Sequence, residues 1–133
     1  MSVAVVDTHT LIWAISGQRK RIGKRAVRLL DRVQQGAGLL LVPTFVLAEI
    51  GEAVHRGRLT LEGGFDAWVE ALLATSTYAA VDLTVPIIRR AQTLFSIAER
   101  GDRLIAATAA ELGHPLLTRD PEIGAAAGVE VIW

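Results

Sequence analysis

The chain has 133 residues, which is enough for one domain with its own hydrophobic core, and it contains no cysteine. Disulfides, thiolate-bound zinc, iron–sulfur clusters and cysteine nucleophiles are therefore excluded. Fourteen Lys and Arg residues balance fourteen Asp and Glu residues, so the net charge by itself indicates no class of partner.

Short apolar strands are predicted to alternate with helices along the whole chain. The first half should hold a strand at 3–6, a helix from Thr8 or Thr10 to about 16, a helix at 23–35, a strand at 39–42, a helix at 45–56 and a helix after Thr60 that carries 65–73. The second half should hold a strand at 78–83, a helix from Thr84 to about 95, a helix headed by Asp102, a strand at 115–118, a short helix after Pro121 and a strand at 129–133.

Several of these helices have recognisable ends. Thr44, Thr60 and Thr84 are predicted to be N-caps, and Gly57 and Gly113 follow the last turns of two helices. Five short apolar strands separated by helices predict an α/β fold, with a parallel sheet covered on both faces. No linker or repeat interrupts the pattern, so we expect a single domain that spans residues 1–133.

Four acidic residues fall where open α/β sheets place functional sites, near the C-terminal ends of strands. They lie after the first strand, in the helix after the second, before the fourth and just past the fourth; they are Asp7, Glu49, Asp102 and Asp120. Carboxylates that share a cleft repel one another unless a cation lies between them. Oxygen ligands without cysteine favour a hard divalent ion, Mg²⁺ or Mn²⁺, which equips a site for phosphodiester hydrolysis.

Each of these acids also has a purely structural interpretation. Asp102 and Asp120 are suitable helix N-caps, a role typically worth about 1 kcal/mol, and Glu49 suits an ordinary helix surface. Asp7 is the hardest to explain in this way, because it ends a buried strand. Thr118 either hydrogen-bonds within the site or simply finishes its strand. The joint placement of the four acids favours the functional interpretation.

Basic residues are concentrated in one segment, since seven of the fourteen lie within 19–32. Such a stripe is either a solvated helix face or a nucleic-acid contact, and both interpretations stay open. Arg103 and Arg119 stand beside Asp102 and Asp120, where they either contact phosphate or orient the neighbouring acid. The candidate nucleic-acid-binding residues of the stripe are Arg21, Lys24, Arg25 and Arg28.

The segments VVDTHTLIWAI, PTFVLAEI, GDRLIAATAAELG and LLTRD, followed by VEVIW, resemble the PIN-domain ribonucleases, and in particular the VapC-type toxins of bacterial toxin–antitoxin pairs. The resemblance spans nearly the whole chain. It implies a three-layer α/β/α fold whose five-stranded parallel sheet has the order 3-2-1-4-5. It also implies a metal-dependent RNA endonuclease whose acidic positions are Asp7, Glu49, Asp102 and Asp120, with Thr118 as a supporting hydroxyl.

One departure from the family pattern is local: relatives often read Asp-Pro-x-Asp-Arg where this chain reads ERGDR at 99–103. Other phosphate-handling classes fit poorly. A signalling receiver domain needs a lysine near the last strand, and none follows Lys24; a haloacid-dehalogenase-type phosphatase needs an Asp where His9 stands. The alternative that remains is a non-catalytic PIN-like module that binds RNA or a protein. Contributions to the site stay open for Glu52, Glu99 and His9.

Apolar residues make up 51% of the chain, and 12 glycines come in addition. So high a share in a small domain indicates a permanent protein interface. Together with the resemblance it implies a homodimer and a cognate VapB-type antitoxin that masks the site. The apolar helix residues expected to meet this partner are Leu11, Ile12, Trp13, Phe65, Trp68 and Leu72.

We expect a cytoplasmic protein without a membrane span. The longest stretch without a charge, 33–48, is shorter than the about 20 residues that a spanning helix needs and is broken by Gly36, Gly38 and Pro43. The N-terminus lacks the basic start of a signal peptide.

Overall fold

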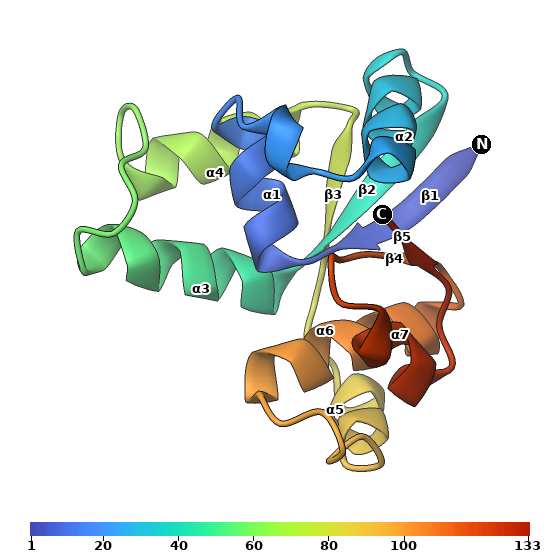
Figure 1. Cartoon of the computed structure of the whole chain (residues 1–133). Coiled ribbons are helices and arrows are strands. Elements are labelled where there is room, and N and C mark those ends of the chain that lie inside the picture. Colours follow the sequence, from blue (N-terminus) through green and yellow to red (C-terminus); the bar gives the residue numbers. More distant parts are fainter.

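A five-stranded parallel sheet forms the centre of the computed structural model, which describes all 133 residues (Figure 1). The strands are β1 (Ser2–Val6), β2 (Gly38–Pro43), β3 (Tyr78–Val81), β4 (Leu116–Leu117) and β5 (Val131–Ile132). Their order in the sheet is β3-β2-β1-β4-β5, and every neighbouring pair is parallel. The predicted fold class and strand order are confirmed.

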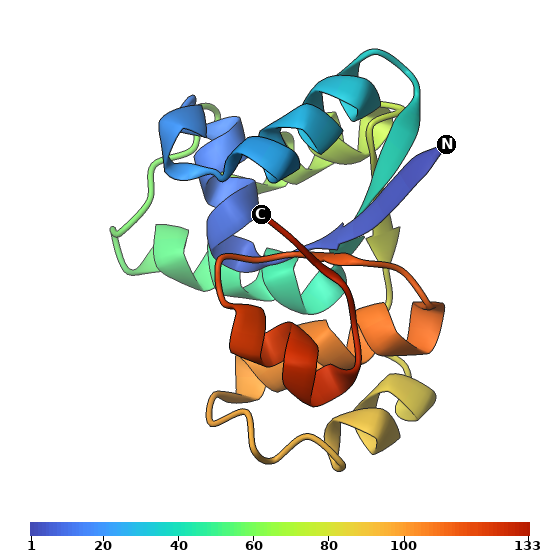
Figure 2. The ribbon, with the colours of Figure 1, turned by 45° about the vertical axis from the view of Figure 1, so that its right-hand side comes forward.

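Helices cover both faces of this sheet. They are α1 (Thr8–Ile15), α2 (Lys24–Gln34), α3 (Thr44–His55), α4 (Phe65–Ala74), α5 (Val85–Ala91), α6 (Arg100–Leu112) and α7 (Pro121–Ala127), with a 3₁₀ turn η1 (Arg19–Arg21) before α2. Figures 1 and 2 show α5, α6 and α7 together on one side of the sheet, and α1, α2 and α4 on the other. None of the helices has both the length and the apolar character that crossing a bilayer requires.

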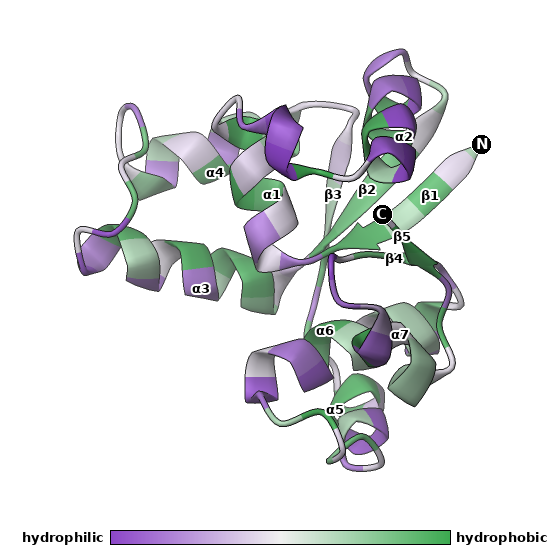
Figure 3. Ribbon diagram, viewed as in Figure 1, coloured by the Kyte–Doolittle hydropathy of each residue, from purple (hydrophilic) through white to green (hydrophobic).

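The core lies between the sheet and these helices because the strands are apolar runs and the helices are amphipathic. Ala4, Val5 and Val6 of β1 are fully buried. On α2 the buried residues share one face, and its outward side is hydrophilic (Figure 3). No buried side-chain nitrogen or oxygen lacks a hydrogen-bond partner.

Two of the predicted helix starts next to the site are wrong. Asp102 does not head α6: the helix begins at Arg100 with Glu99 in the N-cap position, and Asp102 lies in the first turn. Thr44 is the first residue of α3, not its N-cap. The Thr44 hydroxyl instead accepts a hydrogen bond from the Leu83 N–H at 3.2 Å, so it ties the start of α3 to the segment after β3.

The helices on either side of β3 are also shorter than predicted. Thr60 caps nothing, because α4 begins only at Phe65. Gly63 and Gly64 precede it with φ values of 78° and 88°, a left-handed conformation that favours glycine and excludes a continuous helix. At its far end α5 stops at Ala91, where the Thr93 hydroxyl donates to a helix carbonyl and the backbone continues in turns.

The prediction of an exposed apolar face on α1 and α4 is wrong for half of the named residues. Leu11, Trp13 and Leu72 are buried in the core of the single chain, since other elements cover them. Ile12, Phe65 and Trp68 are partly buried and pack against the same core. The large exposed apolar side chains gather instead on and around α5, and they include Leu83, Val85, Ile88 and Phe95.

Candidate active site

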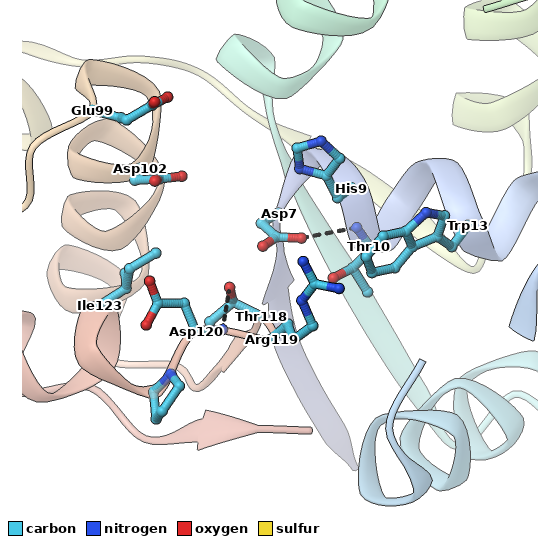
Figure 4. A pocket seen from close by; sticks show the side chains of 11 residues that line it. Asp7, His9, Thr10, Trp13, Glu99, Asp102, Thr118, Arg119, Asp120 and Ile123 are labelled. Atoms are coloured by element: carbon cyan, nitrogen blue, oxygen red, sulfur yellow. Dashed lines mark hydrogen bonds between the residues drawn. The ribbon is translucent and has the colours of Figure 1, made fainter. Parts of the chain in front are cut away.

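The strand order creates a crevice between β1 and β4. The chain adds β2 and β3 on one side of β1 and then β4 and β5 on the other, so the connections that follow β1 and β4 diverge at their C-terminal ends. A cavity of about 540 Å³ lies there (Figure 4). Among the residues that line it are Asp7, Glu99, Asp102, Thr118, Arg119 and Asp120.

Asp7 is fixed at the centre of this cavity by its own backbone. Its N–H donates to the Leu117 carbonyl of β4 at 3.3 Å, and its carbonyl accepts the first helical hydrogen bond of α1 from Leu11 at 3.1 Å. One carboxylate oxygen caps α1 by accepting from the Thr10 N–H at 2.9 Å. The other oxygen points into the cavity (Figure 4). The Asp7 side chain therefore caps α1 and lines the cavity at the same time.

Asp120 and Thr118 reach the cavity from the loop after β4. The Asp120 carboxylate caps α7 through the Glu122 N–H at 2.9 Å, so the structural interpretation of this acid is realised as well. Thr118 is only 2% exposed, and its hydroxyl accepts from the Asp120 N–H at 3.4 Å. The buried threonine therefore holds the backbone that presents the acid.

Asp102 lies one turn from Glu99 on α6, and both carboxylates face Asp7 across the cavity (Figure 4). Burial raises the pKa of Asp102 above its ordinary value. Nearby carboxylates raise this pKa further; in decreasing order of effect they are Glu99, Asp7, Glu49 and Asp120. No cation offsets them, so the predicted acids do share one electrostatic environment, and Glu99 belongs to it.

Glu49 approaches from α3 and lines a second cavity of about 430 Å³, which shares Asp7, Glu99 and Asp102 with the first. The Thr8 hydroxyl donates to Glu49 Oε1 at 2.5 Å. Glu49 also lies against the first turn of α6: a Cβ at Gly101 would come within 3.1 Å of Oε2. Thr8 was not among the predicted site residues, and its only signal in the sequence is its place directly after Asp7.

Neither arginine beside a site acid forms an ion pair with it, so the interpretation that these arginines orient their neighbouring acids is not supported. Arg103 donates to the carbonyls of Ile97 and Ala98 at 2.8 and 2.7 Å, and its guanidinium lies 4.4 Å from the centroid of the Phe95 ring. It therefore organises the loop before α6 rather than orienting Asp102. Arg119 forms no ion pair with Asp120 and lies 5.5 Å from the centroid of the Trp13 ring.

Part of the basic stripe is used within the fold. Arg25 pairs with Glu130 at 3.4 Å, and Arg19 pairs with Asp31 at 2.7 Å. Lys24 and Arg28 are exposed on α2 and line neither cavity. Arg21 also lines neither cavity, but its guanidinium lies 5.9 Å from the centroid of the ring of Trp13, which lines the first cavity.

Solved structures share this fold along nearly the whole chain. VapBC2 from Rickettsia felis, bound to a DNA fragment from their promoter, superposes with a TM-score of 0.72 at 14% identity, covering 97% of this chain and 96% of that chain. FitAcB from Neisseria gonorrhoeae superposes with a TM-score of 0.64 at 20% identity, covering 97% of this chain and 95% of that chain. FitAB bound to an IR36 DNA fragment superposes with a TM-score of 0.63 at 20% identity, covering 97% of this chain and 92% of that chain.

No curated protein matches the sequence. The model of the PIN domain family matches residues 4–129, which include all four predicted acids as well as Thr118. The chain therefore belongs to the PIN domain family.

Proposed function

We propose that this protein is an endoribonuclease that depends on Mg²⁺ or Mn²⁺ and hydrolyses RNA phosphodiester bonds. The observation that carries the proposal is the convergence of carboxylates on the β1–β4 crevice, where burial first and the neighbouring acids next raise the pKa of Asp102. Its neighbours are acids on four different elements, whose joint position no single helix cap explains. Membership of the PIN domain family supports nuclease chemistry.

The donors around the crevice fit a hard divalent cation. They are all oxygens, from carboxylates and the Thr118 hydroxyl, which is the ligand chemistry that Mg²⁺ and Mn²⁺ prefer. No three acidic or histidine side chains stand close enough to form a complete ligand set. Asp7, Asp102 and Asp120 would therefore hold the ion partly through water, as is usual for Mg²⁺. Such an ion supplies an acidified water and charge stabilisation at the phosphate.

The chain's own groups orient this chemistry. Asp7 cannot turn away, because its backbone is bonded on both sides and one of its oxygens caps α1. Thr8 fixes Glu49 at the edge of the shared cavity wall, where the carboxylate acts as a ligand or accepts the proton of the attacking water. Thr118 holds the loop that presents Asp120.

The direct test is cleavage of a labelled single-stranded RNA by the purified protein, with Mg²⁺, with Mn²⁺ and with EDTA. We expect cleavage products with either ion and none with EDTA. A DNA strand of the same sequence tests whether the substrate is RNA. Binding of RNA without cleavage under all of these conditions would favour the alternative, a non-catalytic PIN-like module.

Removal of the Thr8 hydroxyl should weaken cleavage without weakening the fold. Thr8→Val keeps the side-chain shape but leaves Glu49 Oε1 without its donor, so cleavage should fall about 10-fold, as on loss of an outer-shell partner of a metal ligand. Thr8→Ser, which retains the hydroxyl, is the matched control and should cleave like the parent. Equal rates for the Val and Ser variants would show that this hydrogen bond does not position Glu49.

We further propose that the protein is the toxin of a toxin–antitoxin pair, held by a VapB-type antitoxin and present as a homodimer. The resemblance to VapC-type toxins and the similarity to the VapBC2 and FitAB structures support this role. The apolar side chains around α5 are candidates for the dimer contact, since Val85 and Phe95 are 59% and 62% exposed.

Expression in bacterial cells tests the toxin role. The protein alone should halt growth and purify as a dimer, and co-expression with the product of the adjacent small open reading frame should restore growth and yield a larger complex. The Asp7→Asn variant is the control, because it should be tolerated alone and still form that complex. A harmless monomer that captures no partner would contradict the toxin role but not the nuclease activity.

A further inference from the structure

Two arginines converge on one indole at the edge of the acidic cavity. The guanidinium groups of Arg119 and Arg21 lie 5.5 and 5.9 Å from the centroid of the Trp13 ring, within the range of a cation–π interaction. They come from different elements, the loop after β4 and the turn η1. Figure 4 shows the Arg119 side chain rising between Asp7 and Trp13. A positive edge thus borders a cavity whose opposite wall is acidic.

The indole is a rigid support for these two cations. Trp13 is 8% exposed, and its ring contacts those of His9 and Trp133 at centroid distances of 5.9 and 6.1 Å. Trp133 in turn is pressed against Gly23, where an added Cβ would come within 2.4 Å of it. These contacts hold the Trp13 ring in the cavity wall, within reach of both arginines.

Neither arginine is neutralised by a carboxylate. Arg19 and Arg25, in the same basic segment, form ion pairs, whereas Arg21 and Arg119 form none, although Arg119 adjoins Asp120. Arg119 is also the only Lys or Arg side chain among the residues that line the first cavity. A guanidinium that stacks on an aromatic ring keeps its N–H donors at the edge available for an anion.

We propose that Arg119 and Arg21, supported by Trp13, form a subsite for a backbone phosphate of single-stranded RNA next to the phosphate that is cleaved. This inference rests on the proposed function. The planar guanidinium matches phosphate oxygens in a bidentate manner, and the subsite adjoins the acids that would hold the cation. Arg119 and Arg21 would bind substrate directly and would offset the repulsion between the acidic wall and the strand.

Binding by the metal-free protein tests the subsite without any cleavage. Fluorescence anisotropy of labelled single-stranded RNA is followed in EDTA over a range of KCl concentrations, with two RNAs of unrelated sequence. Arg119→Gln should weaken binding about 10-fold for both RNAs alike, because a phosphate contact carries no sequence information. The slope of log affinity against log salt should fall by about 1. Arg21→Gln should act in the same direction.

Arg89→Gln is the matched control, because Arg89 is an exposed arginine of α5 that contacts neither Trp13 nor the cavity. It should leave both the affinity and the salt slope near those of the parent. Arg119→Lys should recover part of the affinity, since it restores the charge without the planar fork. The subsite is overturned if Arg119→Gln binds like the parent, or if Arg89→Gln loses as much affinity.

Kinetics with Mn²⁺ separate this inference from the nuclease proposal. Where the parent cleaves RNA, Arg119→Gln should raise KM while kcat changes little, the sign of lost substrate binding. A fall in kcat at unchanged KM would overturn the subsite and leave the nuclease standing. If the parent never cleaves RNA, but Arg119→Gln binds RNA more weakly and with a smaller salt slope, the nuclease proposal is overturned and the phosphate subsite is supported.

Discussion

Replacement of Asp7 by asparagine is expected to abolish RNA cleavage, lowering it at least about 100-fold, while the protein stays folded. Asparagine is as good an N-cap as aspartate, so its amide oxygen would still accept from the Thr10 N–H and α1 would keep its start. What is lost is one negative charge at the centre of the acidic cavity. In the absence of a cation that loss relieves repulsion, so the melting temperature should stay level or rise.

Two further variants distinguish the loss of the catalytic carboxylate from the loss of the helix cap and from the loss of any one negative charge. Asp7→Ala should lose cleavage and also about 1 kcal/mol of stability, because the cap is removed. Asp66→Asn removes an exposed carboxylate from α4, which lines neither cavity, and should cleave like the parent. Cleavage by Asp7→Asn at a rate near that of the parent would remove Asp7 from the catalytic machinery.

The positions of two acids could be predicted because they depend on the strands alone. Asp7 directly follows a buried β-branched run, and Asp120 lies just past an apolar run that could only be a strand in this pattern. Parallel strands end at the same edge, so such residues must face one crevice wherever the strand order turns back. The order itself came from the resemblance, since local patterns do not say which strands are neighbours.

The start of α6 could not be predicted in this way. The segment that contains Glu99 and Asp102 offers several polar residues as helix caps, and propensity does not choose among them. The structure begins the helix two residues before Asp102, where Gly101 allows Glu49 and Phe45 to pack against its first turn. Glu49 and Phe45, which contact this first turn, belong to α3 and are about 50 residues away in the sequence, so local patterns do not reveal the contact.

The burial of Trp13 has a similar cause. Helical periodicity shows that α1 has an apolar side, but not whether another part of the chain covers it. Trp133, the last residue of the sequence, and Arg21 and Arg119 supply that cover. A residue expected to meet a partner protein is therefore part of the wall of the site.

In the metal-free protein, Asp102 is expected to contribute less to stability as the pH rises. The pKa of Asp102 is raised in the folded protein above its ordinary value of 3.8, first by burial and then by its acidic neighbours. Folding therefore favours the protonated carboxyl. The resulting stability is fully present below the unfolded pKa and is lost as the pH rises through the folded pKa.

Asp102→Asn tests the contribution of this carboxyl directly. Melting temperatures of parent and variant, measured in EDTA, should agree at acid pH, where the Asp102 side chain is neutral like asparagine. The variant should become the more stable of the two as the pH rises through the folded pKa of Asp102. The groups that face this side chain, namely Asp7, Glu49, Glu99 and Asp120, remain in both proteins, so the difference reports the burial of the Asp102 carboxylate together with its repulsion by these acids.

Addition of Mg²⁺ or Mn²⁺ at neutral pH should then raise the melting temperature of the parent, because a cation that binds only the folded state stabilises it and removes the repulsion. The same addition should do little for Asp102→Asn, which has lost a ligand and part of that repulsion together. Asp66→Asn should respond to the ion like the parent. A variant no more stable than the parent at neutral pH in EDTA would contradict the raised pKa. An equal response of Asp102→Asn and the parent to the ion would remove Asp102 from the ligands of the cation, because a lost ligand must weaken the stabilisation that the ion provides.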